Sequence, residues 1–332
     1  MYHQPAVKNY LLLAAIVLSA FGTMARAQQS PHMSSGYIPH RVYKSGDKRF
    51  SDFEAMLAEI ARADVAFVGE QHNDPATHRI ERAILEGLAR RRGNVVVALE
   101  MFERDTQPSL DEYLAGRLNE EDFLRSARPW PNYMPDYRPL IEFARVHGWR
   151  AIASNTPRRI AVQVSREGLG AARPDSESER KLVASEISCP MDDYFKRFAE
   201  TLSKGHPGAH QNSGEEKQTD KKQEEERRAA LERFYHAQCV KDETMAESIA
   251  NALGAQGTQP NAQGGPLVVH FNGAFHSDYR LGTASRVIRR APKSNVKVIS
   301  VVPVDNLDSI NVDEYRKRGD YIIFTLKPPS NQ

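Results

Sequence analysis

The 332-residue chain has few cysteines, and none of them lies in a motif through which cysteine usually carries chemistry. Only Cys189 and Cys239 are present, with no CxxC pair, no Cys/His spacing of a zinc site and no CxxCH segment for covalent haem attachment. A GxSxG segment is also absent, so we do not expect a serine nucleophile on a strand-to-helix turn. The two cysteines bracket a charged segment that a disulfide would clamp, and the sequence leaves open whether they pair.

The chain also lacks a net charge once its first residues are set aside. It holds 45 Lys and Arg against 43 Asp and Glu, and residues 1–27 carry Lys8 and Arg26 but no acidic residue. The remaining chain therefore has 43 residues of each sign. A nucleic-acid-binding surface needs a concentration of positive charge, so we expect no nucleic-acid partner.

Long apolar runs are scarce, and the one near the N-terminus has the form of a leader. Lys8 precedes an apolar stretch from Leu11 to about Met24, and Ala25-Arg26-Ala27 supplies a small-x-small cleavage site. The stretch is interrupted too early for a membrane span. We therefore expect a cleaved signal peptide over residues 1–27, a periplasmic protein, and no transmembrane anchor in the mature chain.

Two distant segments end in the same Gly-x-x-His pattern. VAFVGEQH ends at His72 and LVVHFNGAFH ends at His276, and each runs an apolar, strand-like stretch into the pattern. We expect Gly69 and Gly273 to let the backbone bend sharply where each strand ends, because glycine has no Cβ.

A third apolar run, VVVALEMFE (residues 95–103), leads into the carboxylate of Glu100. In parallel sheets the ligand crevice lies beyond the carboxyl ends of the strands. We therefore expect the side chains of four residues to meet at one edge of a sheet: Glu70, His72, Glu100 and His276.

Helical and strand-like patterns alternate on both sides of a long helical stretch. This rhythm predicts an α/β fold with a mostly parallel sheet flanked by helices, its first half over residues 41–156 and its second over 264–328. Residues 157–253 have helical spacing throughout, broken by a polar segment at about 204–224 that we expect to be disordered. Such a helical insertion is expected to form a lid or pocket wall over the crevice.

Four segments, FVGEQHNDPATH, ALEMFERDTQ, DETMAESIA and HFNGAFHSDYRLG, give the chain a resemblance to the ChaN-like haem-binding lipoprotein family. That family belongs to a superfamily with erythromycin esterase, TraB and Tiki proteins. The resemblance implies haem binding and a part in haem or iron uptake, although this chain has no lipobox cysteine. The family motif maps here onto Gly69, Glu70, His72, Glu100, Gly273 and His276.

Haem needs an apolar slot, an axial side chain for the iron and basic groups for its propionates. Because covalent attachment is excluded, haem would be held reversibly. The imidazoles of His72 and His276 are candidates for contact with haem. Tyrosines are the other candidate type, namely Tyr133, Tyr194 and Tyr235, and ordinary packing roles remain open for all three.

A hydrolase, of the esterase or metallopeptidase kind, is the alternative function. Glu70, His72, Glu100 and His276 would then hold a divalent metal that activates water, or a histidine oriented by a glutamate would act as general base. A binding scaffold without activity is a third possibility. The sequence leaves open whether the protein is an enzyme and whether it forms a homodimer.

Overall fold

The computed structural model of the chain describes residues 37–205, 221–254 and 265–328. The predicted signal peptide and residues 206–220 of the predicted disordered segment lie outside the described residues. The two ends of that segment, residues 204–205 and 221–224, are helical, because they belong to α8 (Asp193–Gly205) and α9 (Lys221–Gly254).

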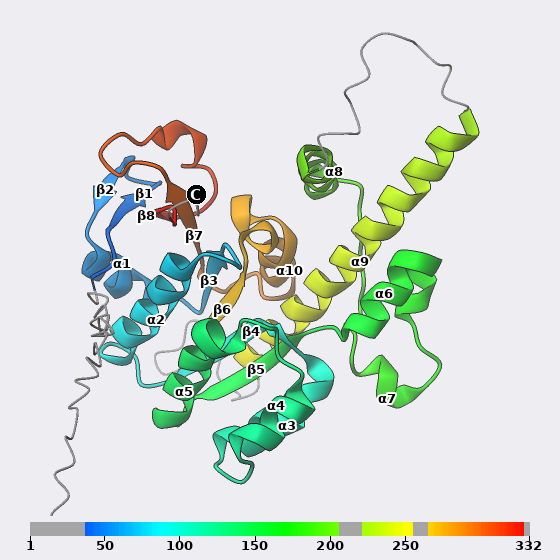
Figure 1. The fold of residues 1–332 in the computed structure, drawn as a ribbon, viewed down its shortest axis with the longest axis horizontal. Helices are drawn as coiled ribbons and strands as arrows, with labels where there is room; N and C mark the ends of the chain where they lie inside the picture. The colour runs from blue at the N-terminus through cyan, green and yellow to red at the C-terminus, as the bar shows by residue number, and fades with distance from the viewer. Residues whose placement is uncertain (1–36, 206–220, 255–264, 329–332) are drawn as a thin grey trace, which may run out of the picture. The chain divides into compact units, whose positions relative to one another are not determined.

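The described residues form one eight-stranded sheet of order β2-β1-β8-β7-β3-β6-β4-β5 (Figure 1). The pairs from β8 to β5 are parallel, whereas β1 pairs antiparallel with both β2 and β8. The predicted, mostly parallel sheet is therefore confirmed, with an antiparallel edge that the sequence pattern had not indicated. The strands are β1 (His40–Lys44), β2 (Arg49–Ser51), β3 (Val65–Glu70), β4 (Val95–Glu103), β5 (Arg150–Asn155), β6 (Leu267–Gly273), β7 (Val296–Val304) and β8 (Tyr321–Leu326).

Alternate residues of each central strand face opposite layers of helices. In β3, Ala66 and Val68 belong to one apolar cluster and Val65 and Phe67 to the other. This is the two-residue period of a strand that is buried on both faces. The first cluster packs under α1 (Phe53–Ile60), α2 (Pro75–Ala89), α3 (Gln107–Leu114), α4 (Glu120–Ala127) and α5 (Arg138–Val146), and the second under α9 and α10 (Gly282–Arg290).

The insertion between β5 and β6 contains no strand among its described residues. Its helices are α6 (Arg158–Glu167), α7 (Glu177–Arg180), α8 and α9. The last, α9, is one helix of 34 residues whose C-terminal part packs on the sheet beside α10 while its N-terminal part leads away from it (Figure 1). Helix α9 thus attaches the insertion to the sheet through its C-terminal part, while its N-terminal part belongs to the portion of the insertion that lies away from the sheet. No helix among the described residues is both long and apolar enough to cross a membrane.

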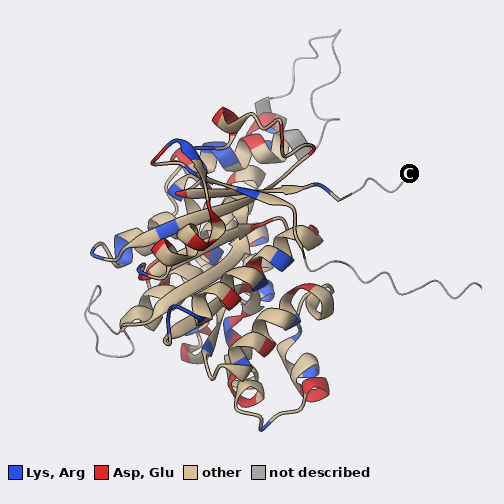
Figure 2. Ribbon diagram, turned by 90° about the vertical axis from the view of Figure 1, so that its left-hand side faces the viewer, with Lys and Arg blue, Asp and Glu red and all other residues tan. Residues whose placement is uncertain are grey.

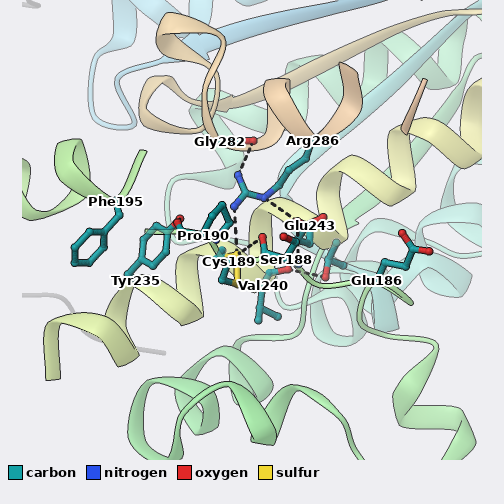
Figure 3. Close-up of a disulfide and its surroundings, with 12 residues drawn as sticks. Glu186, Ser188, Cys189, Pro190, Phe195, Tyr235, Val240, Glu243, Gly282 and Arg286 are labelled. Atoms are coloured by element: carbon teal, nitrogen blue, oxygen red, sulfur yellow. Dashed lines mark hydrogen bonds and ion pairs between the residues drawn. A yellow bond between two sulfur atoms is a disulfide. The ribbon is translucent and has the colours of Figure 1, made fainter. Parts of the chain in front are cut away.

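Cys189 and Cys239 form a disulfide that joins the segment before α8 to α9, with their Cα atoms 5.7 Å apart. Arg286 of α10 lies over this bond (Figure 3). Its guanidinium donates to the Gly282 carbonyl at 2.9 Å and contacts the Cys239 sulfur at 3.2 Å. The disulfide therefore links the segment that leads into α8 to the part of the fold where α9 meets α10.

Charged side chains of both signs are interspersed along the helices and loops, and most of the strand ribbon carries neither (Figure 2). Ion pairs account for many of them, such as Arg104 with Glu247 and Arg280 with Asp320. In the parts that the structure describes, basic and acidic groups are therefore largely matched locally.

We expect the disulfide to stabilise the fold, because it closes a loop of 50 residues in the unfolded chain. Removing it should lower the free energy of unfolding by about 2–4 kcal/mol. The measurement is urea unfolding of the wild type with and without reductant. The Cys189→Ser/Cys239→Ser double variant is the control, because its unfolding should not respond to reductant. Two titratable thiols in the oxidised, purified protein would contradict the pairing.

Candidate functional site

Three neighbouring strands deliver the predicted residues to one edge of the sheet. Glu70, the last residue of β3, pairs with Gly273, the last residue of β6. On the other side of β6, Leu99 of β4 pairs with Phe271, so Glu100 lies one residue further along. The two glutamates therefore flank the end of β6, as the strand pattern predicted.

His276 lies one turn beyond β6, at the end of the 3₁₀ helix Ala274–His276, between two buried carboxylates. Its Nδ1 is 2.8 Å from Asp242 Oδ1, and its Nε2 is 3.3 Å from Glu100 Oε1. Burial alone would lower the pKa of His276, but the charges of Glu100 and Asp242 outweigh it and raise the pKa to about 10. At neutral pH His276 is thus an imidazolium with both nitrogens engaged.

Both carboxylates around His276 have further partners. Glu100 Oε2 accepts the Gly273 backbone N–H at 2.8 Å, and Asp242 Oδ1 accepts the Thr283 hydroxyl at 2.7 Å. Burial alone would raise the pKa of each carboxyl, but the charge of His276 and these surroundings lower it instead. Both groups are therefore ionised, and together with His276 they form a buried Glu–His–Asp cluster.

His72 has a different environment from His276. It lies in the turn between β3 and α2. Helix α2 begins after Asp74, whose side chain accepts hydrogen bonds from the backbone N–H groups of Ala76 and Thr77. Its Nδ1 is 2.5 Å from Glu70 Oε1, whereas its Nε2 makes no hydrogen bond within the described residues. The side chain is 40% exposed, and its ring packs edge-on to Trp130 at 4.9 Å. Burial alone would lower the pKa of His72, but the hydrogen bond to Glu70 and the charges of Glu100 and Glu70 raise it. His72 is thus an oriented ring whose Nε2 has no hydrogen-bond partner among the described residues.

Glu70 is held by a buried group of side chains behind the site. Its Oε1 also accepts the Tyr137 hydroxyl at 2.8 Å, and His78 Nδ1 lies 3.7 Å from its Oε2. His78 Nε2 donates to the His72 carbonyl at 3.1 Å, while its Nδ1 is 2.9 Å from Glu81 Oε2. Burial and the charge of Glu70 raise the pKa of Glu81 well above its usual value.

A neutral Glu81 explains two otherwise orphaned atoms. Glu70 Oε2 and Glu81 Oε1 are buried and have no partner if both groups are carboxylates. A proton on Glu81 lets it donate to Glu70, which satisfies both oxygens and avoids two adjacent buried charges. The orientation of His72 thus depends on a chain of buried groups that leads from Glu70 to Glu81.

Gly69 and Gly273 are needed for space rather than for the sharp bend that the sequence suggested. Neither has a positive φ. A Cβ on Gly273 would lie 2.7 Å from His72 Nε2, and one on Gly69 would lie 3.0 Å from the Cα of Ala274. Each glycine therefore lets a neighbouring part of the site approach the strand end closely.

These side chains open onto a cavity of about 530 Å³, which we call the first cavity. Glu70, His72, Glu100, Gly273 and His276 line one side of it. The insertion supplies the opposite wall, as predicted, with Arg197, Phe198, Thr201 and Leu202 of α8 and Gln238 and Lys241 of α9. Trp130, Phe275 and Arg318 are further lining residues.

A second cavity of about 440 Å³ adjoins the first. Six residues line both, namely Glu100, Trp130, Phe198, Leu202, Gln238 and Lys241. The second cavity extends over the start of α6, where Thr156 and Arg158 line it, and Phe234 of α9 forms part of its wall. The two cavities can therefore accommodate parts of one ligand.

The four residues predicted as metal ligands do not form a compact ligand set. Among the described residues, the one group of three with ligand atoms within 4.8 Å of one another is Glu70, His78 and Glu81. That group is buried, only Glu70 of it lines the first cavity, and its orphaned oxygens are satisfied by a proton on Glu81. His276 is held by two carboxylates instead, so the predicted metal site stays a prediction that these contacts do not favour.

The three predicted tyrosines do not line either cavity. Tyr133 packs against Phe102 and Phe123 in the core and is 2% exposed. Tyr194 and Tyr235 pack in a buried cluster beneath the disulfide, where the Tyr235 hydroxyl donates to the Pro190 carbonyl at 2.7 Å. The role of these tyrosines as haem ligands stays a prediction that their packed positions away from the cavities do not favour.

Sequence reasoning missed several residues of the site. Asp242 lies in the segment DETMAESIA, whose pattern was noticed without a role for this residue. Tyr137, four residues after Tyr133, donates its hydroxyl to Glu70, a contact that the sequence pattern did not indicate. Lys241 gave no signal, because a single lysine on a charged helix is usually a solvated one.

The chain matches a known protein family and is similar to a solved structure. Residues 56–287 match the family model described as haem-binding uptake, Tiki superfamily, ChaN. The chain is similar to the structure described as cofacial haem binding to ChaN of Campylobacter jejuni, with a TM-score of 0.59 and 16% identity over 86% of this chain and 96% of that one. At this identity the likeness shows the fold.

Two further similarities are more distant or partial. Protein RETICULATA-RELATED 5, chloroplastic, of Arabidopsis thaliana is 26% identical over 272 residues, which are 76% of this chain. The chain spans about a third of that relative's length, since the match covers 33% of it. An erythromycin esterase mutant in its open conformation matches with a TM-score of 0.43 and 12% identity, over 87% of this chain and 83% of that one.

Glu81→Gln should leave the protein almost as stable as the wild type, because an amide also donates to Glu70. We expect a change below about 1 kcal/mol in the free energy of unfolding at pH 7. Glu81→Ala should cost about 2–3 kcal/mol, because it leaves Glu70 and His78 without this partner. Urea unfolding of the three proteins measures the difference. An equal loss in both variants would mean that Glu81 is ionised.

His276 should remain protonated well above neutral pH. Because its pKa rises from 6.5 to about 10 on folding, its contribution to stability is fully present below pH 6.5 and is lost as the pH rises through about 10. Nitrogen-15 NMR of histidine-labelled protein at pH 8 should report an imidazolium for this residue. A neutral tautomer there would refute the Glu–His–Asp cluster as described.

Proposed function

This chain belongs to the haem-binding uptake family of the Tiki superfamily that includes ChaN, and we propose that it binds haem reversibly in the first cavity. The observation that carries the proposal is His72. It offers an imidazole nitrogen without a partner, at the mouth of a cavity, with its ring oriented by a buried glutamate. Metal-ligating histidines typically have their other ring nitrogen engaged in this way.

The lining of the first cavity fits haem in three respects. Trp130, Phe198, Leu202 and Phe275 supply apolar contact surface. Arg197, Lys241 and Arg318 give the lining positive charge, which suits a ligand that carries carboxylates. The volume of about 530 Å³ lies in the range of pockets that enclose most of a small-molecule ligand.

His72 and His276 have different roles in this proposal. His72 ligates the iron that bound haem supplies, and Glu70 fixes its ring and increases its basicity. His276 is held by Asp242 and Glu100 on its two nitrogens and does not compete for the iron. Its contribution is to position β6 and α9, which form two sides of the cavity.

The second part of the proposal concerns where the protein acts in the cell and what its haem binding serves. We propose that residues 1–27 direct the chain to the periplasm, where reversible haem binding would serve haem or iron uptake. The support is the leader pattern together with the family's description as haem-binding uptake proteins. Homodimer formation around the ligand remains a prediction, and light scattering with and without haemin tests it.

A hydrolase is the second candidate function, and the contact between His72 and Glu70 favours it as well. An imidazole oriented by a carboxylate, with a free nitrogen facing an open cavity, is also the arrangement of a general base. His276 is unsuited to that role because both of its ring nitrogens are engaged by carboxylates. Hydrolysis of activated esters that is lost in His72→Ala and insensitive to chelator would support this function, and unchanged turnover in that variant would dismiss it.

Haemin titrated into the purified protein should produce a Soret band that saturates at one haem per site. His72→Ala should weaken binding about tenfold or more and shift the band, because the iron loses its ligand. His147→Gln is the matched control, since His147 is exposed on the far end of α5 and lies outside both cavities. Absence of a Soret band with the wild type, or identical spectra for wild type and His72→Ala, would overturn the proposal.

A further inference from the structure

The second cavity has a feature that His72 does not explain, an unpaired positive charge at its junction with the first. Lys241 is half-buried and lines both cavities, yet its ammonium makes no hydrogen bond or ion pair within the described residues. The charge of Lys241 acts on the buried carboxylate of Glu100 and contributes to its lowered pKa, but the ammonium donates no hydrogen bond to that carboxylate, whose oxygens contact Gly273 and His276. A half-buried ammonium without an acceptor is costly unless water or a ligand supplies one.

A second cation lines the far side of the same cavity. Arg158 is the first residue of α6 and has no ion pair within the described residues, whereas the adjacent Arg159 is paired with Glu179. The helix start beside it has no side-chain cap, so its first N–H groups add positive potential. The acidic residue Glu103 in this lining is engaged by Arg128 at 3.2 Å.

Apolar side chains surround these cations. Phe234 and Leu202 line the second cavity and are 54% and 38% exposed, which places them among the few large apolar side chains of the described residues that face solvent. Trp130 and Phe198 continue the apolar surface into the first cavity. The combined lining is that of a site for an apolar body that carries negative groups.

We propose that Lys241 and Arg158 form a carboxylate-binding subsite in the second cavity, so that the ligand is an apolar molecule whose carboxylates extend there from the first cavity. This inference rests on the proposed haem binding and deepens it. Haem satisfies the requirement, because it combines a large apolar ring with two carboxylates. In this arrangement His72 would hold the haem in the first cavity. Lys241, at the junction of the two cavities, would bind the haem carboxylates and so determine the orientation of the ring.

The experiment compares haemin with its dimethyl ester, which has the same ring and iron but no carboxylate charge. Affinities are measured by absorbance titration for the wild type, Lys241→Met and Lys241→Arg. The wild type should bind haemin about tenfold more tightly than the ester. Lys241→Met should lose most of this preference through weaker haemin binding with unchanged ester binding, and Lys241→Arg should retain it.

Two controls make the outcome specific. Lys196→Met removes a lysine of α8 that is 70% exposed and paired with Asp193, outside both cavities, and should bind both compounds as the wild type does. Arg158→Gln should reduce the preference for haemin in the same direction as Lys241→Met. Circular dichroism checks that each variant is folded.

The results separate this inference from the proposed function. If the wild type binds haemin and its ester equally and Lys241→Met changes neither, the carboxylate subsite is refuted while haem binding stands. If the wild type binds neither compound, the proposed function fails and this inference fails with it. A preference for haemin that disappears only in the Lys241 and Arg158 variants establishes the subsite.

Discussion

The arrangement of the site depends on one buried interaction, the imidazolium of His276 between Glu100 and Asp242. The three groups come from the turn after β6, from β4 and from α9, so this contact joins the sheet to the helical insertion. A positive charge between two negative charges is tolerated at this depth because each carboxylate also accepts a hydrogen bond. It acts together with other polar contacts between α9 and the sheet, such as the Ser248 hydroxyl, which donates to the Ser154 carbonyl of β5 at 3.0 Å.

A second buried network prepares His72, and the two networks meet at Gly273. Tyr137, His78 and a neutral Glu81 hold Glu70, and Glu70 orients the imidazole. His72 Nε2 approaches the strand so closely that a Cβ on Gly273 would collide with it. The protein thus contains two histidines with different surroundings. His276 is buried with both ring nitrogens held by carboxylates, whereas His72 is partly exposed and one of its ring nitrogens faces a cavity without a partner.

The insertion determines what the sheet edge can bind. Its helix α8 supplies apolar and basic side chains to the cavity, and α9 supplies Lys241 at the junction of the two cavities. The disulfide ties α9 to the segment before α8, close to where α9 meets α10. A sheet that presents histidines and glutamates at strand ends would suit many chemistries, and it is this covering wall that favours a large, apolar, negatively charged ligand.

The sequence alone determined the α/β class, the helical insertion and the convergence of Glu70, His72, Glu100 and His276, because buried parallel strands have a strong apolar pattern and their ends share one edge of the sheet. It could not distinguish Tyr137 from Tyr133, since both lie in one irregular loop and only packing decides which faces Glu70. It could not assign Asp242 or Lys241, which reach the site from a helix more than 100 residues away from Glu100 along the chain. The protonation states of His276 and Glu81, and the side chains to which they hydrogen-bond, were likewise decided by the tertiary structure. They depend on burial and on charges that only folding brings together.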